Sequence, residues 1–389
     1  MTINMEIKEL EAQYKKVFKN KPTDYIRCGG RFEILGNHTD HNHGKCIAAT
    51  CGLSIYSACE KNNTSTIKVF SKGYGEFEVN LDNLEIKESE KGTSSGIIRG
   101  VSKYLNEKGY KIGGFNMYME SQIFPGAGVS SSAAFELLIG ETFNELFNEN
   151  KIERIVLSKA GQFAENNYYG KNSGLLDQIG VAFGGFVSID FIDIENPKVK
   201  PITMDLKDYS FILVNTGGDH SLMSNLYSKI PLDMYDVARI LGVNYLREST
   251  LENLNKMKNK IEKSKYERAL HFYKENERVD KAILAIENGD IKSLINLMNE
   301  SRKSSTELLK NMMVENHYHG SPLEACELVD KITNNEAGAK INGGGFAGSI
   351  VCLVNDKYKN NFLKTMKEKY GKDNVYEVTV DNKGVGKIE

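Results

Sequence analysis

The sequence lacks any hydrophobic run long enough to cross a membrane. No stretch approaches the roughly 20 apolar residues that a bilayer-spanning helix requires. Residues 1–20 form a polar, amphipathic pattern rather than a basic segment followed by an apolar core. These absences predict a cytoplasmic protein with no membrane partner.

The sequence also lacks an excess of charge of one sign. Fifty Lys and Arg stand against 52 Asp and Glu, a net charge of −2, and both signs are interspersed in stretches such as 262–268 and 275–281. A concentrated basic surface is typical of proteins that bind nucleic acid or anionic membranes. We therefore expect no nucleic-acid partner.

The cysteines lack the spacing of a disulfide or metal framework. The six cysteines, none in a C-x-x-C pair, are Cys28, Cys46, Cys51, Cys59, Cys326 and Cys352. Their scatter among apolar residues predicts reduced, packed thiols. Cys28 and Cys46 lie near the first motif described below, where a reactive thiol is the alternative.

Proline is scarce, and no linker separates domains in an obvious way. Only six of 389 residues are proline, with no internal repeat or low-complexity tract. A chain of this length exceeds what one hydrophobic core usually serves, so two domains with a cleft between them are expected. The element pattern changes near residue 205 and divides the chain into residues 1–205 and 206–389.

Both halves combine helix and strand patterns. Apolar residues recur at helical spacing over 132–149, 152–169 and 358–369, and helical patterns dominate 231–318. Strand-like segments cover 47–59, 66–69, 75–81, 211–214, 348–354 and 375–380, while 186–194 and 198–204 resemble a hairpin. The predicted fold class is α+β.

The first of three unusual clusters is residues 30–44, GRFEILGNHTDHNHG, which combines an Arg, an Asp, three His and three Gly. Imidazole and carboxylate are donors that suit zinc, so His38, Asp40, His41 and His43 are candidate ligands. Alternatively, they are hydrogen-bonding loop residues, because strand alternation would separate His38 and Asp40 from His41. The residues alone leave both interpretations open.

The second cluster is residues 125–134, PGAGVSSSAA, a small-residue loop that leads directly into a helical pattern. Glycines let the backbone curl around an oxyanion, the helix N-terminus presents unpaired N–H groups, and serines add hydroxyl donors. The segment favours phosphate binding, although it lacks the Gly-Lys-Ser/Thr ending of a P-loop. A tight turn with a serine cap is the alternative.

The third cluster is the triple glycine 343–345, followed after Phe346 and Ala347 by Gly348 and a strand. Such glycines favour close approach of a ligand or another backbone. Between the second and third clusters, Asp177 interrupts an apolar, glycine-flanked stretch. It is either a helix-start residue or a placed catalytic group.

Taken in order, the three clusters resemble the motifs of the GHMP small-molecule kinases, and the first is similar to the galactokinase signature G-R-x-N-x-I-G-E-H-T-D-Y-N-x-G. The resemblance continues through nearly the whole chain, at Ala164-Glu165, Gly174–Gln178, Asp219–Leu222 with Tyr227, Leu246–Glu248, Asn299–Ser301 and Gly384-Val385. It implies a β/α N-terminal domain and a ferredoxin-like C-terminal domain, with the active site in the cleft between them.

The resemblance implies an ATP-dependent sugar 1-kinase, a galactokinase-like phosphotransferase that uses an alcohol group as acceptor. Asp177 matches the catalytic aspartate that takes the proton of the anomeric hydroxyl, and Arg31 matches the arginine that keeps this carboxylate ionised. Glu165 and one of Ser131 and Ser132 match the ligands of Mg²⁺. The residues that match the nucleotide phosphate loop are Gly126, Ala127, Gly128, Val129, Ser130, Ser131, Ser132 and Ala133.

The matching sugar pocket consists of Asn37, His38, Asp40, Gly174 and Tyr227, which gives His38 and Asp40 a role without zinc. Four positions depart from the family pattern, all on the sugar side: Asn37 for Glu, His41 for Tyr, Glu33 for Asn and Ala48 for Pro. Asn37 matches the residue that contacts the C6 group of the sugar. An amide there permits a hydroxyl or a carboxylate, and His41 or Lys45 would add positive charge if they face the pocket.

We therefore expect a small-molecule sugar substrate, with galactose first and galacturonate or another C6-modified galactose as the alternative. A non-catalytic galactose-sensing relative is a second alternative, although the small residues 130–134 and both Asp177 and Arg31 are present. A zinc hydrolase is the third. The sequence gives no indication of oligomeric state.

Overall fold

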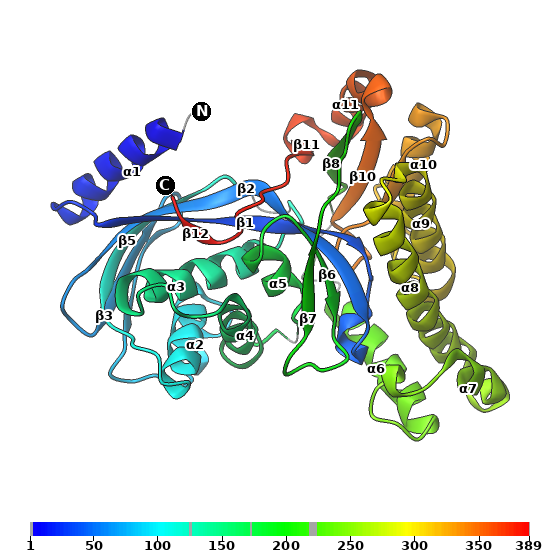
Figure 1. Cartoon of the computed structure of the whole chain (residues 1–389), viewed down its shortest axis with the longest axis horizontal. Coiled ribbons are helices and arrows are strands. Elements are labelled where there is room, and N and C mark those ends of the chain that lie inside the picture. Colours follow the sequence, from blue (N-terminus) through cyan, green and yellow to red (C-terminus); the bar gives the residue numbers. More distant parts are fainter. Residues whose placement is uncertain (1–2, 124–126, 172, 218–223, 389) are drawn as a thin grey trace.

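The computed structural model describes residues 3–123, 127–171, 173–217 and 224–388. Within these ranges the chain forms an eight-stranded sheet and a four-stranded sheet, with helices packed on both (Figure 1). No helix in the described part of the chain is long and apolar enough to span a membrane.

The large sheet is mostly antiparallel and has the order β12-β1-β2-β5-β3-β4, with β6 paired to β2 and β7 paired to β6. Its strands are β1 (Asp24–Leu35), β2 (Lys45–Lys61), β3 (Thr66–Ser71), β4 (Gly75–Asn80), β5 (Phe115–Ser121), β6 (Phe186–Asp190), β7 (Lys198–Ile202) and β12 (Gly386–Lys387). The predicted hairpin is confirmed as β6 and β7. The last strand, β12, returns to pair with β1.

Helices cover both faces of this sheet. The helices on one face are α2 (Ser94–Glu107), α3 (Ser131–Phe147), α4 (Arg154–Ala164) and α5 (Leu176–Ala182), whereas α1 (Ile3–Phe18) packs on the other (Figure 1). Leu137, Leu138 and Phe143 of α3 are fully buried. The predicted helix 132–149 is confirmed as α3, and the pattern over 152–169 is confirmed as α4 with a π-helical turn at Glu165–Tyr169.

The small sheet is antiparallel, with the order β11-β8-β10-β9. Its strands are β8 (Tyr209–Asn215), β9 (Gly338–Ile341), β10 (Ser349–Asn355) and β11 (Val375–Val378), and α10 (Pro322–Thr333) and α11 (Asp356–Tyr370) pack on it. The remaining helices are α6 (Ser224–Ile240), α7 (Leu251–Lys256), α8 (Lys263–Glu287) and α9 (Ile291–Ser304). The predicted strands 211–214, 348–354 and 375–380 and the predicted helix 358–369 are confirmed.

Aromatic side chains join the two sheets. Phe32 of β1 and Phe186 of β6 place their ring centroids 4.9 Å and 6.0 Å from that of Phe211 on β8, and all three residues are buried. Glu33, next to Phe32, pairs with Lys340 of β9 at 2.8 Å. These contacts bring the sugar-side motif of β1 against the third glycine motif. A domain boundary at residue 205, between β7 and β8, stays a prediction.

All six cysteines are buried and unpaired. Burial raises the pKa of the Cys28 and Cys46 thiols well above its usual range. A thiol held in the protonated form is a poor nucleophile. The structure therefore favours packed thiols over a reactive cysteine beside the first motif.

Candidate active site

Asp177, in the first turn of α5, lies between the first two sequence motifs. Arg31 Nε on β1 donates to Asp177 Oδ1 at 2.7 Å, and Ser130 Oγ donates to Asp177 Oδ2 at 2.5 Å. Burial raises the pKa of Asp177, but the adjacent Arg31 guanidinium outweighs burial, so the pKa lies below its usual value. The carboxylate is therefore ionised and held at both oxygens.

The predicted phosphate loop, residues 126–133, leads from the end of β5 into α3, and residues of both sheets hold its described part in place. Gly128 O accepts from Arg31 Nη1 at 2.9 Å and from Asn342 Nδ2 at 2.8 Å, while Ser349 Oγ donates to Ala127 O at 3.0 Å. Gly126 lies outside the described residues. The described members, Ala127, Gly128, Val129, Ser130, Ser131, Ser132 and Ala133, lead into the first turn of α3, whose free N–H groups suit an anion.

Glu165 follows α4 and is buried beside the phosphate loop. Its Oε1 accepts from Ser132 Oγ at 3.2 Å and from Lys171 Nζ at 2.7 Å. Its Oε2 accepts from Ser173 Oγ at 2.5 Å and from Gln178 Nε2 at 3.2 Å. Ser131, in contrast, is exposed. Of the two serines that the sequence left open, the structure brings Ser132 to Glu165.

His38 and Tyr227 lie together at the third glycine motif. His38 Nε2 is 2.9 Å from Gly344 O, and the His38 and Tyr227 rings are 5.1 Å apart. A Cβ atom on Gly344 would lie 1.9 Å from the Tyr227 ring, so only glycine permits this approach. Burial lowers the pKa of His38 to about 4, which keeps its imidazole neutral. The matching stretch Asp219–Leu222, ahead of Tyr227, lies outside the described residues.

Asp40 begins a short 3₁₀ turn and faces Gly174. His41 N donates to Asp40 Oδ1 at 2.9 Å, and a Cβ atom on Gly174 would lie 1.7 Å from Asp40 Oδ2. Burial, followed by the charge of Asp177, raises the pKa of Asp40 to about 6. The predicted sugar residues His38 and Asp40 of the β1–β2 connection, Gly174 and Tyr227 therefore converge from three parts of the chain, close to the predicted catalytic aspartate.

Asn37 differs from these residues because protein groups already engage its amide. Asn37 Nδ2 donates to Gly343 O at 2.7 Å and to Glu33 Oε1 at 3.2 Å, and Asn37 Oδ1 accepts from Asn311 Nδ2 at 2.9 Å. The residue is fully buried. Both amide hydrogens are committed to the protein, and contact of Asn37 with the sugar stays a prediction.

The positive charge considered for the sugar pocket is not supplied by His41 or Lys45. Lys45 Nζ lies 2.7 Å from both carboxylate oxygens of Asp280 on α8. Burial lowers the pKa of His41 well below its usual value, so the imidazole is neutral. Neither group therefore adds positive charge to the predicted pocket, because Lys45 is paired with Asp280 and the lowered pKa keeps His41 neutral.

The zinc interpretation finds no support in the geometry. His38 bonds Gly344 O, His41 Nδ1 lies 3.0 Å from Asn42 Nδ2, and the His43 ring stacks on Tyr245 at 3.7 Å. Within residues 3–123, 127–171, 173–217 and 224–388, no group of three or more His, Cys, Asp or Glu side chains is placed to hold a metal ion.

Helix α8 supplies two site residues that the motifs did not reveal. Glu275 Oε1 accepts from Gly36 N at 3.0 Å, and His271 Nε2 lies 2.9 Å from Asn37 O. Arg278 Nε donates to Glu275 Oε2 at 2.7 Å. His271, Glu275 and Arg278 recur at helical spacing, which places them on one face of α8. This spacing is the sequence feature that could have pointed to them.

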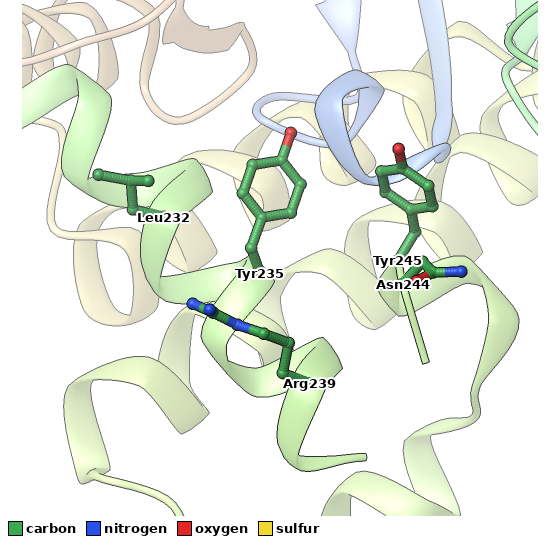
Figure 2. Close-up of a pocket in the computed structure, with 5 residues that line it drawn as sticks. All are labelled: Leu232, Tyr235, Arg239, Asn244 and Tyr245. Carbon is green, nitrogen blue, oxygen red and sulfur yellow. The ribbon is translucent and has the colours of Figure 1, made fainter. Parts of the chain in front are cut away.

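A cavity of about 560 Å³ lies next to this site rather than in it. Its lining residues are Leu232, Tyr235, Arg239, Asn244 and Tyr245 (Figure 2). Tyr235 OH donates to His41 O at 2.9 Å, and Tyr245 stacks on His43. The cavity therefore adjoins the loop that carries Asp40, but none of the predicted catalytic residues lines it.

Comparison with known proteins agrees with this geometry. Residues 96–185 match the family model for the GHMP kinases N terminal domain, and residues 12–61 match that for the galactokinase galactose-binding signature. A galactokinase of Limosilactobacillus reuteri is 29% identical over 95% of this chain and 96% of its own. A galactokinase of Streptococcus thermophilus is also 29% identical, over 94% of both chains.

Solved structures share the fold. The chain superposes with a TM-score of 0.85 on Lactococcus lactis galactokinase complexed with galactose, at 24% identity over 98% of this chain and 99% of the other. Methanococcus jannaschii mevalonate kinase gives a TM-score of 0.65 at 16% identity, over 94% and 100% of the two chains.

The fold and the three converging motifs define a small-molecule kinase with an α+β GHMP kinase architecture. Within that class, the chain is similar to galactokinases, and this similarity supports a sugar kinase that acts as a phosphotransferase.

Proposed function

We propose that this chain transfers the γ-phosphoryl group of ATP to the anomeric hydroxyl of galactose. The observation that carries the proposal is the contact of Asp177 with Arg31 from the sugar-side motif and with Ser130 from the phosphate loop. A carboxylate at that junction stands where an acceptor hydroxyl and a nucleotide phosphate would meet. The galactose-binding signature and the galactokinase relatives support the choice of sugar.

Asp177 accepts the proton of the sugar hydroxyl as that oxygen bonds to phosphorus and the bond to the ADP oxygen breaks. Its lowered pKa keeps it ionised at neutral pH, as a proton acceptor requires. Arg31 holds the carboxylate in place and offsets negative charge that spreads over the transferring group. Little covalent chemistry is needed, since phosphoryl transfer depends mainly on alignment and charge neutralisation.

Ser132 and Glu165 would hold Mg²⁺ beside the phosphate loop. A hydroxyl and a carboxylate are the hard oxygen donors that this ion prefers. Glu165 Oε1 already accepts a cationic group, the Lys171 ammonium, at 2.7 Å, so the donor set fits a cation. When bound, Mg²⁺ neutralises phosphate charge. Residues 127–133 and the N-terminus of α3 bind the phosphates through backbone N–H groups.

The sugar pocket suits a neutral hexose better than a uronic acid. Asp40 places a carboxylate there that would repel a carboxylate on C6, whereas Glu33 and Asp177 are already paired with Lys340 and Arg31. Lys45 is paired with Asp280, and the Asn37 amide donors are committed. These observations support galactose over galacturonate.

A panel of sugars in an ATP-consumption assay tests the proposal. We expect ADP release with galactose and much less with glucose, galactosamine, arabinose or galacturonate. An Asp177→Asn variant serves as the inactive control. Preferred turnover of galacturonate would assign the other sugar. Tight binding of galactose and ATP without ADP release from any sugar would indicate a sensor rather than an enzyme.

A further inference from the structure

Lys171 places an ammonium group at the nucleotide side of the proposed active site. Its Nζ lies 2.7 Å from Glu165 Oε1, the same oxygen that accepts from Ser132 Oγ of the phosphate loop at 3.2 Å. Lysine and phosphate-loop serine thus share one acceptor atom. None of the three sequence motifs includes Lys171.

This ion pair differs from an ordinary surface pair in the burial of its two members. The Glu165 side chain is 1% exposed, whereas the Lys171 side chain is 51% exposed. The carboxylate is therefore fixed, and the lysine reaches it from the solvent side. A long side chain in that position can change partners without disturbing the core.

The local balance of charge leaves a role for a mobile cation. Glu136, Glu165 and Asp177 gather here, and Gln178 Nε2 donates to both Glu136 and Glu165. Burial, followed by the charge of Glu165, raises the pKa of Glu136 well above its usual value, so Glu136 adds no full negative charge. Arg31 is committed to Asp177 and to Gly128 O. Among the described residues, Glu165 is the hydrogen-bond partner of Lys171 Nζ.

We propose that Lys171 is a phosphate-binding catalytic residue that exchanges partners when the nucleotide binds. Its ammonium neutralises Glu165 in the free protein and bonds oxygens of the nucleotide's terminal phosphates in the complex. Lysine binds phosphate as a point charge with three donors, which tolerates such a change of partner. The inference rests on the proposed function and adds a residue to its nucleotide site.

Direct binding tests the inference without turnover. We compare Lys171→Met, Lys171→Arg and the wild-type chain by calorimetric titration with a non-hydrolysable ATP analogue, with and without Mg²⁺, and with adenosine. Lys171→Met is expected to weaken analogue binding roughly 10- to 100-fold, the range of a charge-assisted hydrogen bond. Adenosine affinity stays unchanged, and Lys171→Arg recovers part of the loss.

The matched control is Lys159→Met, which removes a lysine paired with Glu195 at 3.1 Å, away from the phosphate loop. It is expected to bind the analogue like the wild-type chain. A thermal melt of each variant shows whether it folds. If Lys171→Met does not fold, Lys171→Arg tests the inference instead, because it keeps the charge.

Equal analogue binding by the wild-type chain and Lys171→Met overturns the inference and reduces the lysine to a surface partner of Glu165. Tighter binding by Lys171→Met overturns it as well, since the lysine would then only compete with the metal. If the wild-type chain binds no analogue at all, the proposed function fails and the inference fails with it.

Discussion

Glu275 Oε1 lies 3.0 Å from the backbone nitrogen of Gly36, although the two residues are 239 positions apart. Glu275 also accepts from Ser301 Oγ at 2.7 Å, and Arg278 and the other donors keep its pKa at about 2 despite burial. A permanently ionised carboxylate on α8 therefore holds the backbone just before His38. A helix from the C-terminal half of the chain therefore sets the position of the sugar loop, residues 36–44, which carries the predicted sugar residues His38 and Asp40.

Glu275→Gln is expected to weaken galactose binding roughly 5- to 100-fold, because an amide accepts less strongly from the loop and no longer neutralises Arg278. Affinity for an ATP analogue should be unchanged. Calorimetric titration of both ligands checks this. The matched control is Glu277→Gln, an exposed residue of the same helix. Equal loss of both ligands would contradict a role confined to the sugar loop.

Asp177→Asn is expected to lower turnover by roughly 10²- to 10⁴-fold, because the amide keeps the shape and the contact with Ser130 but cannot accept a proton. Galactose affinity should change little. Steady-state kinetics and a sugar titration separate the two effects. Near-normal turnover would remove Asp177 from the proton transfer.

Ser132→Ala is expected to raise the Mg²⁺ concentration needed for half-maximal activity by about an order of magnitude, because it removes a proposed oxygen ligand. Ser131→Ala, its neighbour and matched control, should leave the requirement unchanged. Titration of Mg²⁺ at fixed ATP checks both variants. A larger effect in Ser131→Ala would transfer the ligand role to that serine.

Asp40 predicts a pH dependence of sugar binding. Burial and the charge of Asp177 raise the pKa of Asp40 to about 6. The protonated Asp40 side chain therefore stabilises the folded state, and this stabilisation is lost as the pH rises through about 6. A carboxylate that accepts from sugar hydroxyls must be ionised. Galactose affinity should therefore fall as the pH drops below about 6, by up to about tenfold per pH unit.

Calorimetric titration with galactose between about pH 5 and 8 measures this dependence. An Asp40→Asn variant should bind the sugar weakly at every pH, without the acidic decline. The same decline in that variant would place the titrating group elsewhere.

The backbone form of the loop that leads into α3 could be predicted because it depends on local sequence. Small residues before a helical pattern allow a tight loop at a helix N-terminus, and α3 begins at Ser131 as that pattern requires. Apolar periodicity likewise predicted α4, the β6–β7 hairpin and α11. These features depend on residues within a few positions of one another, which a single sequence records.

Contacts between distant segments could not be predicted in the same way. The sequence did not reveal that the Asn37 amide bonds Gly343 O, Glu33 and Asn311, or that Lys45 pairs with Asp280. The partner of each polar group depends on which helix packs over the loop. Residue type and spacing do not carry that information.

The sequence by itself indicated the kinase class of this protein, because its three ordered motifs resemble those of the GHMP kinases. Only the tertiary structure decided that Ser132 rather than Ser131 meets Glu165, that Lys171 joins them, and that α8 holds the sugar loop. The physical reason is that motif chemistry follows from local backbone geometry, whereas the charges around a buried site are set by packing between elements far apart in the chain.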